Sequence, residues 1–274
     1  MPNVGTANTD FSIRPDHFCI VVDDLDKAVE QYQSLGFTIT KGAKASGGHN
    51  ALIVFEDGIY IELMHFPKAR LQRILLALTR PIGLFNLMLS GDKEILRRFL
   101  IHWTNAPSGH WVDWSFAVEP MEAAVEHVRA SGFEVAKSAY VSERLNSENE
   151  TARWKMQGTP NTNLPFLIED FSGSAPRAPL NKGHSHDNGA VALKEVILGS
   201  PDPQKTLEDL SKLTNIDVDD DKVELNGVAF KCKRDSERKY AGPMELVLSS
   251  ASGEVPEGRL EPLITGGAQI SLIK

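Results

Sequence analysis

The fold is decided by residues 16–40, which read DHFCIVVDDLDKAVEQYQSLGFTIT. The first seven are mostly apolar, β-branched or aromatic, a composition typical of strands. Aspartates follow where they can cap a helix, and apolar residues then recur every three or four positions on one helical face. Gly36 suits the left-handed conformation that ends many helices. The stretch therefore predicts a strand, a helix over 27–35 and a second strand over 37–40.

The same pattern occurs more than once along the chain. Two more strands are expected up to residue 66, so the first unit has the order βαβββ. Similar units begin at Trp111 and at Val191, and the sequence GFEV at 132–135 repeats GFTI at 36–39. Such internal similarity is stronger evidence than any single predicted element. We therefore predict an α+β fold of repeated βαβββ modules.

The repeats also suggest how the chain is divided. A length of 274 residues is long for one compact core and suits two. A stretch rich in Gly, Ser, Pro, Asn and His separates the second and third units, as a linker does. We expect a flexible leader at 1–14, a two-unit domain at 15–171 with a helical insert at 67–108, a linker at 172–189 and a third βαβββ-like unit at 190–274.

Composition and charge limit the partners. A net charge of −8 repels phosphate backbones, so nucleic-acid binding is not expected. The sequence lacks an apolar run of about 18 residues and a signal peptide, so we expect a cytoplasmic protein without a membrane partner. Two cysteines make no disulfide framework, and Cys19 is interpreted as a buried, inert thiol. The expected partner is a small-molecule substrate or ligand, bound by a monomer or homodimer.

Several short motifs point to one superfamily. They are DH at 16–17, DLD at 24–26, LGF at 35–37, NAL at 50–52, YIEL at 60–63 and LPFLIE at 164–169. With these motifs the chain resembles the glyoxalase-like branch of the vicinal-oxygen-chelate superfamily, which also includes bleomycin-resistance proteins and extradiol dioxygenases. The resemblance implies that two βαβββ units pack into a cupped mixed sheet around a pocket.

The resemblance also implies a metal site. In metal-using members the ligands come from the first and last strands of the units. Carried over to this sequence, these positions are His17 and Glu62 in the first unit and Trp114 and Glu169 in the second. Trp114 cannot bind a metal, so His17, Glu62 and Glu169 are the expected ligands. The cofactor would be one divalent metal (Zn, Fe, Mn or Ni), or there would be none.

The residues themselves allow a functional and a structural interpretation. Side chains alternate along a strand, so His17 shares a face with Cys19, and Glu62 shares one with Tyr60. A carboxylate in an apolar strand must be paired, bound to metal or exposed. If both faces line a pocket, His17 and Glu62 are catalytic groups. Otherwise His17 is a strand-start histidine bonded to backbone and Glu62 a surface residue.

Other candidates come from the loop before the third strand and from the aromatic residues. His49 lies beside Gly47 and Gly48, which allow close backbone approach, so it is a candidate acid or base, or else an ordinary loop histidine. Aromatic side chains on pocket strands can stack on flat ligands, although they also build cores. The expected substrate contacts are Trp114, Trp154, Tyr60 and Asn50.

Two functions follow from this sequence. The first is a glyoxalase-like enzyme of the isomerase, lyase or dioxygenase type, in which a His/Glu pocket, with or without a metal, moves protons on a small oxygenated substrate. The second is a non-catalytic protein of the same fold that binds or sequesters a small molecule. Trp114 stands where metal-using members have a metal ligand, and this favours the binding protein. The pair His17 and Glu62 favours the enzyme.

Overall fold

The protein is described by a computed structural model. The described residues are 10–42, 49–67, 71, 74–75, 77–78, 89–103, 105–145, 150–171, 177, 185–250, 258–260, 265 and 267–273. Among them, no helix combines the length and the apolar character that crossing a bilayer requires.

The first unit has the predicted order, except that its second strand is shorter. Its elements are β1 (Ser12–Val21), α1 (Leu25–Ser34), β2 (Thr40–Lys41), β3 (His49–Val54) and β4 (Tyr60–His65). The carboxylate of Asp24 caps α1 by accepting a hydrogen bond from the Lys27 N–H. The strand expected over 37–40 is reduced because Thr38 bonds elsewhere: its N–H donates to His186 and its hydroxyl to the carbonyl of Ser185.

The second unit follows a helical insert. The described part of the insert includes the 3₁₀ turn η1 (Gly91–Lys93) and helix α4 (Glu94–Trp103). The unit itself consists of β5 (His110–Glu119), α5 (Met121–Ala130), β6 (Tyr140–Leu145), β7 (Thr151–Gln157) and β8 (Phe166–Asp170). Residues 132–135 form no strand, so the expectation based on their likeness to 36–39 was wrong, and β6 begins only at Tyr140.

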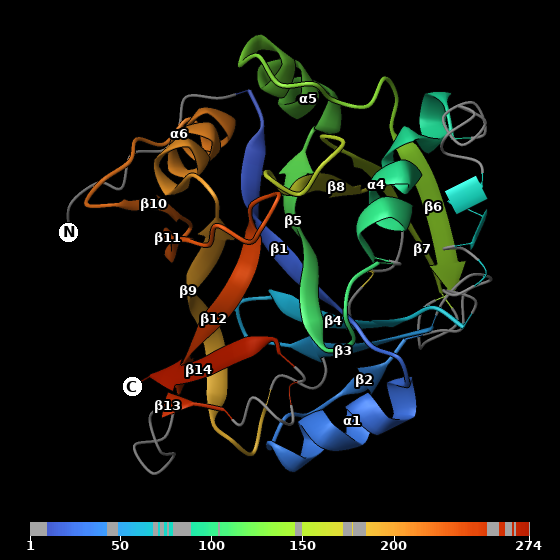
Figure 1. The fold of residues 1–274 in the computed structure, drawn as a ribbon, viewed down its shortest axis with the longest axis vertical. Coiled ribbons are helices and arrows are strands. Elements are labelled where there is room, and N and C mark those ends of the chain that lie inside the picture. Colours follow the sequence, from blue (N-terminus) through green and yellow to red (C-terminus); the bar gives the residue numbers. More distant parts are fainter. Residues whose placement is uncertain are drawn as a thin grey trace.

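The two units share one sheet of eight strands in the order β2-β3-β4-β1-β5-β8-β7-β6 (Figure 1). Each unit pairs its first strand with its last in parallel, β1 with β4 and β5 with β8. The antiparallel pair β1 and β5 joins the units. The ladder between them has a bulge at Asp16, which has no partner on β5, and bulges often re-aim side chains near functional sites.

The third segment forms a sheet of its own. Its elements are β9 (Ala190–Ser200), α6 (Pro203–Thr214), β10 (Lys222–Leu225), β11 (Val228–Arg234), β12 (Gly242–Ser250), β13 (Gly258–Arg259) and β14 (Gln269–Ile273). The strand order is β10-β11-β9-β12-β14-β13. β9 is parallel to β11 and antiparallel to β12, as β1 is to β4 and β5. This segment therefore repeats the pairing of two units.

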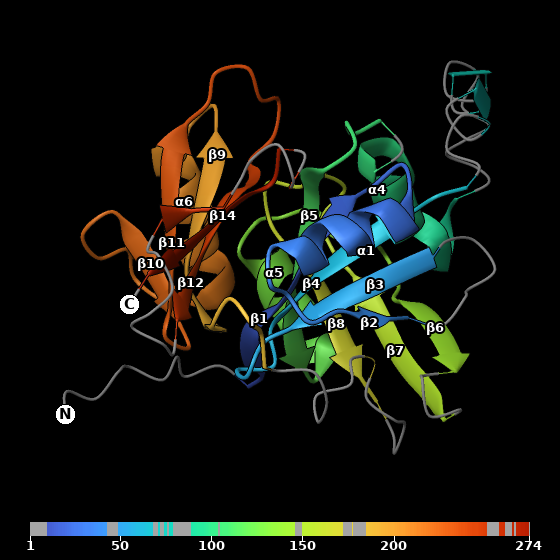
Figure 2. The ribbon, with the colours of Figure 1, turned by 90° about the horizontal axis from the view of Figure 1, so that it is seen from below.

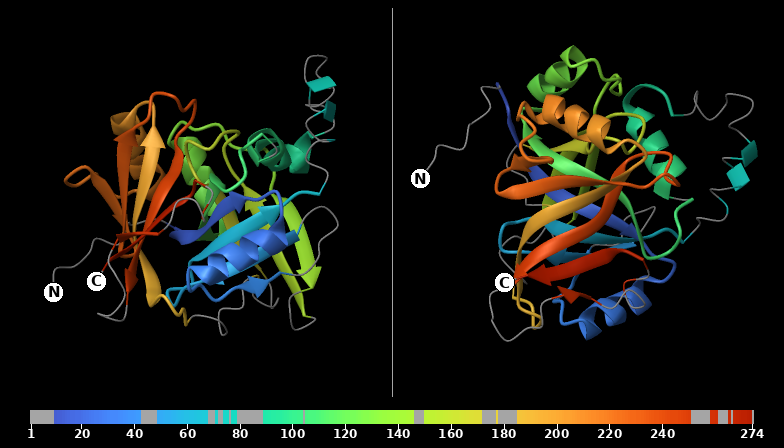
Figure 3. Two further views of the ribbon diagram at one scale, coloured as in Figure 1. Left: turned by 60° about the horizontal axis from the view of Figure 1, so that its bottom comes forward. Right: turned by 60° about the vertical axis from the view of Figure 1, so that its left-hand side comes forward.

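The two sheets lie against each other, as Figure 2 shows. The main core fills the space between them, where Trp114 and Phe116 of β5 contact Phe230 of β11. A second, smaller core lies on the other face of the first sheet and includes Ile95 and Trp103 of α4. Figure 3 shows the ribbon of that helix on this side of the sheet. The first sheet is thus buried on both faces, and its β1 strand contributes side chains to each core alternately. That second face carries the site described next.

Candidate functional site

A cavity of about 400 Å³ lies between the first sheet and α4. Its walls are mostly apolar and aromatic, with Phe99 and Trp103 from α4, Trp154 from β7 and Phe166 from β8. The size and the apolar lining are typical of small-molecule sites. A few polar side chains are also part of the wall, and they are His17, Asn50, Tyr60, Glu62, Ser142, Glu143 and Arg177.

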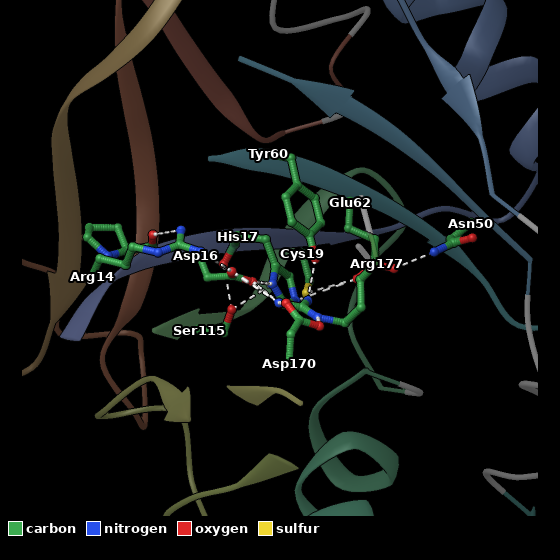
Figure 4. A network of polar contacts seen from close by, with 11 residues as sticks. Arg14, Asp16, His17, Cys19, Asn50, Tyr60, Glu62, Ser115, Asp170 and Arg177 are labelled. Carbon is green, nitrogen blue, oxygen red and sulfur yellow. Dashed lines mark hydrogen bonds and ion pairs between the residues drawn. The ribbon is translucent and has the colours of Figure 1, made fainter. Parts of the chain in front are cut away.

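His17 and Glu62 meet on neighbouring strands at this wall. β1 and β4 are parallel, with His17 beside Tyr60 and Cys19 beside Glu62. The Nε2 atom of His17 lies 3.6 Å from Oε2 of Glu62, and the sulfur of Cys19 lies 3.9 Å from the same oxygen (Figure 4). Strand alternation thus brings a histidine, a thiol and a carboxylate together at one end of the cavity.

The imidazole of His17 is oriented by the bulge at Asp16. The irregular register allows these consecutive side chains to meet, with Nδ1 of His17 2.6 Å from Oδ2 of Asp16. The hydroxyl of Ser115 lies 2.7 Å from the same nitrogen, and Tyr60 stacks on the ring. A carboxylate can only accept, so Nδ1 carries the proton and the lone pair of the neutral ring is on Nε2, which faces Glu62.

Arg177 keeps Asp16 ionised. Burial alone would raise the pKa of Asp16, but the guanidinium of Arg177 and the hydrogen bond with His17 overcome it and hold that pKa well below its usual value. Arg177 approaches both oxygens of Asp16 at 3.2 Å and contacts Asp170 at 2.6 Å. It also donates to the hydroxyl of Tyr60 at 2.8 Å. An arginine from beyond the second unit therefore anchors the group that orients His17.

We expect the variant Arg177→Gln to unfold at a higher pH during acid titration. A carboxylate whose folded pKa is depressed stabilises the fold above its unfolded pKa, and that stability is lost as pH falls through the folded pKa. Without Arg177 burial dominates, so the pKa of Asp16 rises and its protonation begins at higher pH. Acid unfolding followed by circular dichroism measures the shift. Arg14→Gln is the control, because Arg14 is half exposed and 3.9 Å from Asp16, and an unshifted Arg177→Gln midpoint would contradict the assignment.

Glu62 is held by Asn50 on one oxygen only. The side-chain amide of Asn50 donates to Oε1 at 2.5 Å, and the amide oxygen of Asn50 is buried without a partner. Among the described residues, Oε2 has no neighbour closer than the 3.6 Å contact with His17. That distance is longer than a hydrogen bond. Three groups with lone pairs therefore converge, and the 3.9 Å contact from the Cys19 thiol to Oε2 of Glu62 is a long, weak hydrogen bond between two of them.

The donor set of His17, Cys19 and Glu62 fits a divalent cation. One ligand atom from each lies within 4.8 Å of the other two. Ligand atoms of a four-coordinate zinc site are about 3.3–3.7 Å apart, given bonds of about 2.0–2.3 Å. The 3.6 Å contact lies within this range, and the 3.9 Å contact lies slightly above it. Burial raises the pKa of the Cys19 thiol well above its ordinary value, and Glu62 adds to this. The side chain by itself is therefore a neutral thiol.

The structure does not bring Glu169 or Trp114 to this cluster. Glu169 lies on the other face of β8, where it accepts from the N–H of Met121 and pairs with Lys155 at 3.2 Å. Trp114 is fully buried between the sheets, and its indole N–H donates to the carbonyl of Thr162. Each of these two residues is one position away from a residue on the cavity side, and a shift of one residue reverses the face of a strand.

The positions of the second unit that match His17, Cys19, Tyr60 and Glu62 carry no metal ligand. Ser115 and Ala117 of β5 pair with Phe166 and Ile168 of β8, just as His17 and Cys19 pair with Tyr60 and Glu62. The second unit thus has hydroxyl, methyl, phenyl and alkyl groups at the places where the first has imidazole, thiol, phenol and carboxylate.

The remaining candidates are divided between the cavity and the surface. Trp154, Tyr60 and Asn50 line the cavity, where a substrate contact was expected. His49 begins β3, and because Asn50 faces the cavity, alternation turns His49 away from it. His49 instead lies near His65, with ring centroids 6.4 Å apart.

Sequence reasoning missed Arg177, Ser115 and the position of Cys19 next to Glu62. Arg177 lies in a stretch interpreted as a linker, and nothing local distinguishes it from a solvated arginine. Ser115 follows Trp114 directly and could have been found only by knowing the register of β5. Cys19 was placed on the face of His17, but its neighbour Glu62 depends on the parallel pairing of β1 and β4.

Comparisons with known proteins agree with this fold. A family model described as a glyoxalase-like domain matches residues 16–214. A hypothetical protein from Staphylococcus aureus is 15% identical, with a TM-score of 0.67 over 96% of this chain and 99% of that one. The Mn(II)-bound glyoxalase from Novosphingobium aromaticivorans is 9% identical, with a TM-score of 0.51 over 94% of this chain and 80% of that one.

No curated protein matches the sequence. The family match covers most of the chain, and the paired βαβββ units agree with the resemblance seen in the sequence. Both the expected glyoxalase-like family and the expected fold class are confirmed. The chain belongs to the glyoxalase-like domain family.

Proposed function

We propose that the protein is a glyoxalase-like enzyme that moves a proton on a small oxygenated molecule bound in the cavity. One observation carries this proposal: Nε2 of His17 and Oε2 of Glu62 lie 3.6 Å apart on the wall of a largely apolar cavity. A base and a second polar group that converge in a site sheltered from water are what proton transfer requires.

Each polar residue has a distinct role in this proposal. Glu62 is the base, and Asn50 fixes it by holding Oε1, so that Oε2 faces the substrate. His17 presents the lone pair of Nε2 as an acceptor for a substrate hydroxyl, because Asp16 holds the proton at Nδ1. A divalent metal held by His17 and Glu62 would polarise a substrate oxygen as a Lewis acid. The Mn(II) bound to the Novosphingobium glyoxalase supports a metal of this charge.

The walls suggest which molecules fit. Phe99, Trp103 and Trp154 offer flat apolar surfaces, so the substrate would carry an aromatic or alkyl group at one end and oxygens at the other. The oxygen-bearing end would face His17 and Glu62. An isomerase or lyase fits better than a dioxygenase, because non-haem iron oxygenases typically use two histidines and a carboxylate, whereas this cluster has one histidine.

A non-catalytic binding protein is the second candidate. It is favoured by the second unit, whose cavity-side residues Ser115, Ala117, Phe166 and Ile168 contribute no metal ligand. A cavity with mostly apolar walls can hold a ligand by shape and stacking alone.

A direct experiment separates the two candidates. We expect purified protein to contain close to one divalent metal per chain and to exchange a substrate C–H proton with deuterated water. The substrates to test carry adjacent oxygens and an aromatic or alkyl group, and exchange is followed by nuclear magnetic resonance. Treatment with a chelator should abolish exchange, and the metal should restore it. Tight binding without exchange or product, with or without metal, would support the binding protein instead.

A further inference from the structure

Cys19 lies beside both His17 and Glu62, which line the wall of the cavity. It follows His17 by two residues on β1 and therefore points to the same face, and the parallel register sets it beside Glu62. Its side chain is fully buried, and its sulfur lies 3.9 Å from Oε2 of Glu62. Figure 4 shows the three side chains converging from two adjacent strands.

Glu62 differs from the aspartates near the cavity in the charges around it. Asp16 and Asp170 are both paired with Arg177, and Asp113 is paired with Arg98. The carboxylate of Glu62 is only 13% exposed, and no arginine or lysine among the described residues pairs with it. A buried carboxylate is costly unless a cation or hydrogen bonds compensate it. Glu62 accepts a hydrogen bond from Asn50 on Oε1 and a long one from the neutral Cys19 thiol on Oε2, and neither supplies a positive charge on the side of Oε2.

The positions of the second unit that match the cluster add no ligand to a cation site at this place. The hydroxyl of Ser115 is engaged by Nδ1 of His17, and Ala117 and Ile168 have no ligand atoms. The first unit, in contrast, offers Nε2 of His17, Oε2 of Glu62 and the sulfur of Cys19, all within 4.8 Å of one another. Three protein ligands with one open position is the arrangement of catalytic zinc sites.

We propose that Cys19 is the third ligand of the cation, so that the first unit alone supplies the ligand set and the open position faces the cavity. This inference rests on the metal-assisted form of the proposed function. A thiolate ligand favours metals such as Zn²⁺ and Co²⁺ over Mn²⁺ and Mg²⁺, which prefer oxygen ligands. The site therefore selects a thiophilic divalent metal.

The chain offers a clean test, because it has only two cysteines. Cys232 lies on β11 of the other sheet, so Cys232→Ser leaves Cys19 as the single thiol without altering the site. We expect this variant, loaded with Co²⁺, to keep the sulfur-to-metal charge-transfer absorption in the near ultraviolet. Any such absorption in this variant must come from Cys19, and no change at the buried Cys19 is needed to see it.

The reciprocal variant measures what the thiolate contributes. Cys19→Ser should lose the charge-transfer absorption, and its affinity for Zn²⁺ should fall by more than about 100-fold, because even the partners of ligands contribute about 10–100-fold. Its affinity for Mn²⁺ should fall much less. Near-ultraviolet circular dichroism checks that the variant is folded.

The outcomes separate this inference from the function on which it rests. If Co²⁺ binds to Cys232→Ser without a charge-transfer band, Cys19 is not a ligand, but a metal at His17 and Glu62 still stands. If no divalent metal binds to the unmodified protein, both the Cys19 inference and the metal-assisted mechanism are overturned. A band present in Cys232→Ser and absent from Cys19→Ser supports the inference.

Discussion

Glu62→Gln is expected to lower turnover by about 10²–10⁴-fold, the usual contribution of a positioned acid or base. The amide keeps the shape of the side chain and can still bond Asn50, but it cannot accept a proton. It also removes the anionic ligand, so metal content should fall with turnover. Steady-state kinetics and elemental analysis of the same preparation measure both effects.

Glu169→Gln is the matched control. Glu169 lies on β8 of the same sheet and is as buried as Glu62, with its side chain 11% exposed against 13%. It faces away from the cavity, where it bonds the N–H of Met121 at the start of α5. We expect it to lower stability by about 1 kcal/mol and to leave turnover and metal content unchanged. Equal losses in the two variants, or none in Glu62→Gln, would remove Glu62 from the mechanism.

Arg98→Ala is expected to destabilise the protein by about 3–5 kcal/mol, the usual result of removing one partner of a buried ion pair. Arg98 and Asp113 have side chains that are 1% and 0% exposed. The guanidinium contacts both oxygens of Asp113, at 2.9 Å and 2.5 Å, and donates to the carbonyl of Leu164 at 2.8 Å. Removing it leaves a carboxylate buried without a cation. Urea unfolding measures the loss.

Two further variants test the cause of this loss. Arg98→Met combined with Asp113→Leu removes both charges, so we expect it to be more stable than Arg98→Ala. Lys41→Ala breaks an exposed pair with Asp26 and should change stability by less than about 1 kcal/mol. A double variant as unstable as Arg98→Ala would mean that lost packing, and not the unpaired buried charge of Asp113, causes the loss of stability.

The variant Arg98→Ala should also bind ligands of the cavity less tightly. Arg98 fixes α4, and this helix carries the cavity residues Phe99 and Trp103.

Local sequence patterns predicted most helices and strands of the first unit, and also which side chains share a face of each strand. The alternation of apolar residues placed His17 with Cys19 and Glu62 with Tyr60, and both pairs lie on the cavity side. Periodicity and caps located α1 because these signals depend on neighbours in the chain. The parallel register that joins the pairs is a long-range feature and has no local signal.

The second unit shows where sequence reasoning fails. The resemblance matches Trp114 of the second unit to His17 of the first. The parallel pairing of each unit instead places Ser115 at the position equivalent to His17, one residue after Trp114. One position reverses the face of a strand, so Trp114 became a core residue and Ser115 the neighbour of His17.

The origin of Arg177 has a consequence for how the protein matures. Chains emerge from the ribosome from the amino terminus onward, and domains generally fold as units as they appear. The eight-stranded sheet ends at Asp170, yet the guanidinium that neutralises Asp16 is seven residues further on. A nascent chain halted at the last strand of that sheet would hold His17 against a buried, uncompensated carboxylate. The polar end of the cavity is therefore completed only after the sheet that surrounds it has been synthesised.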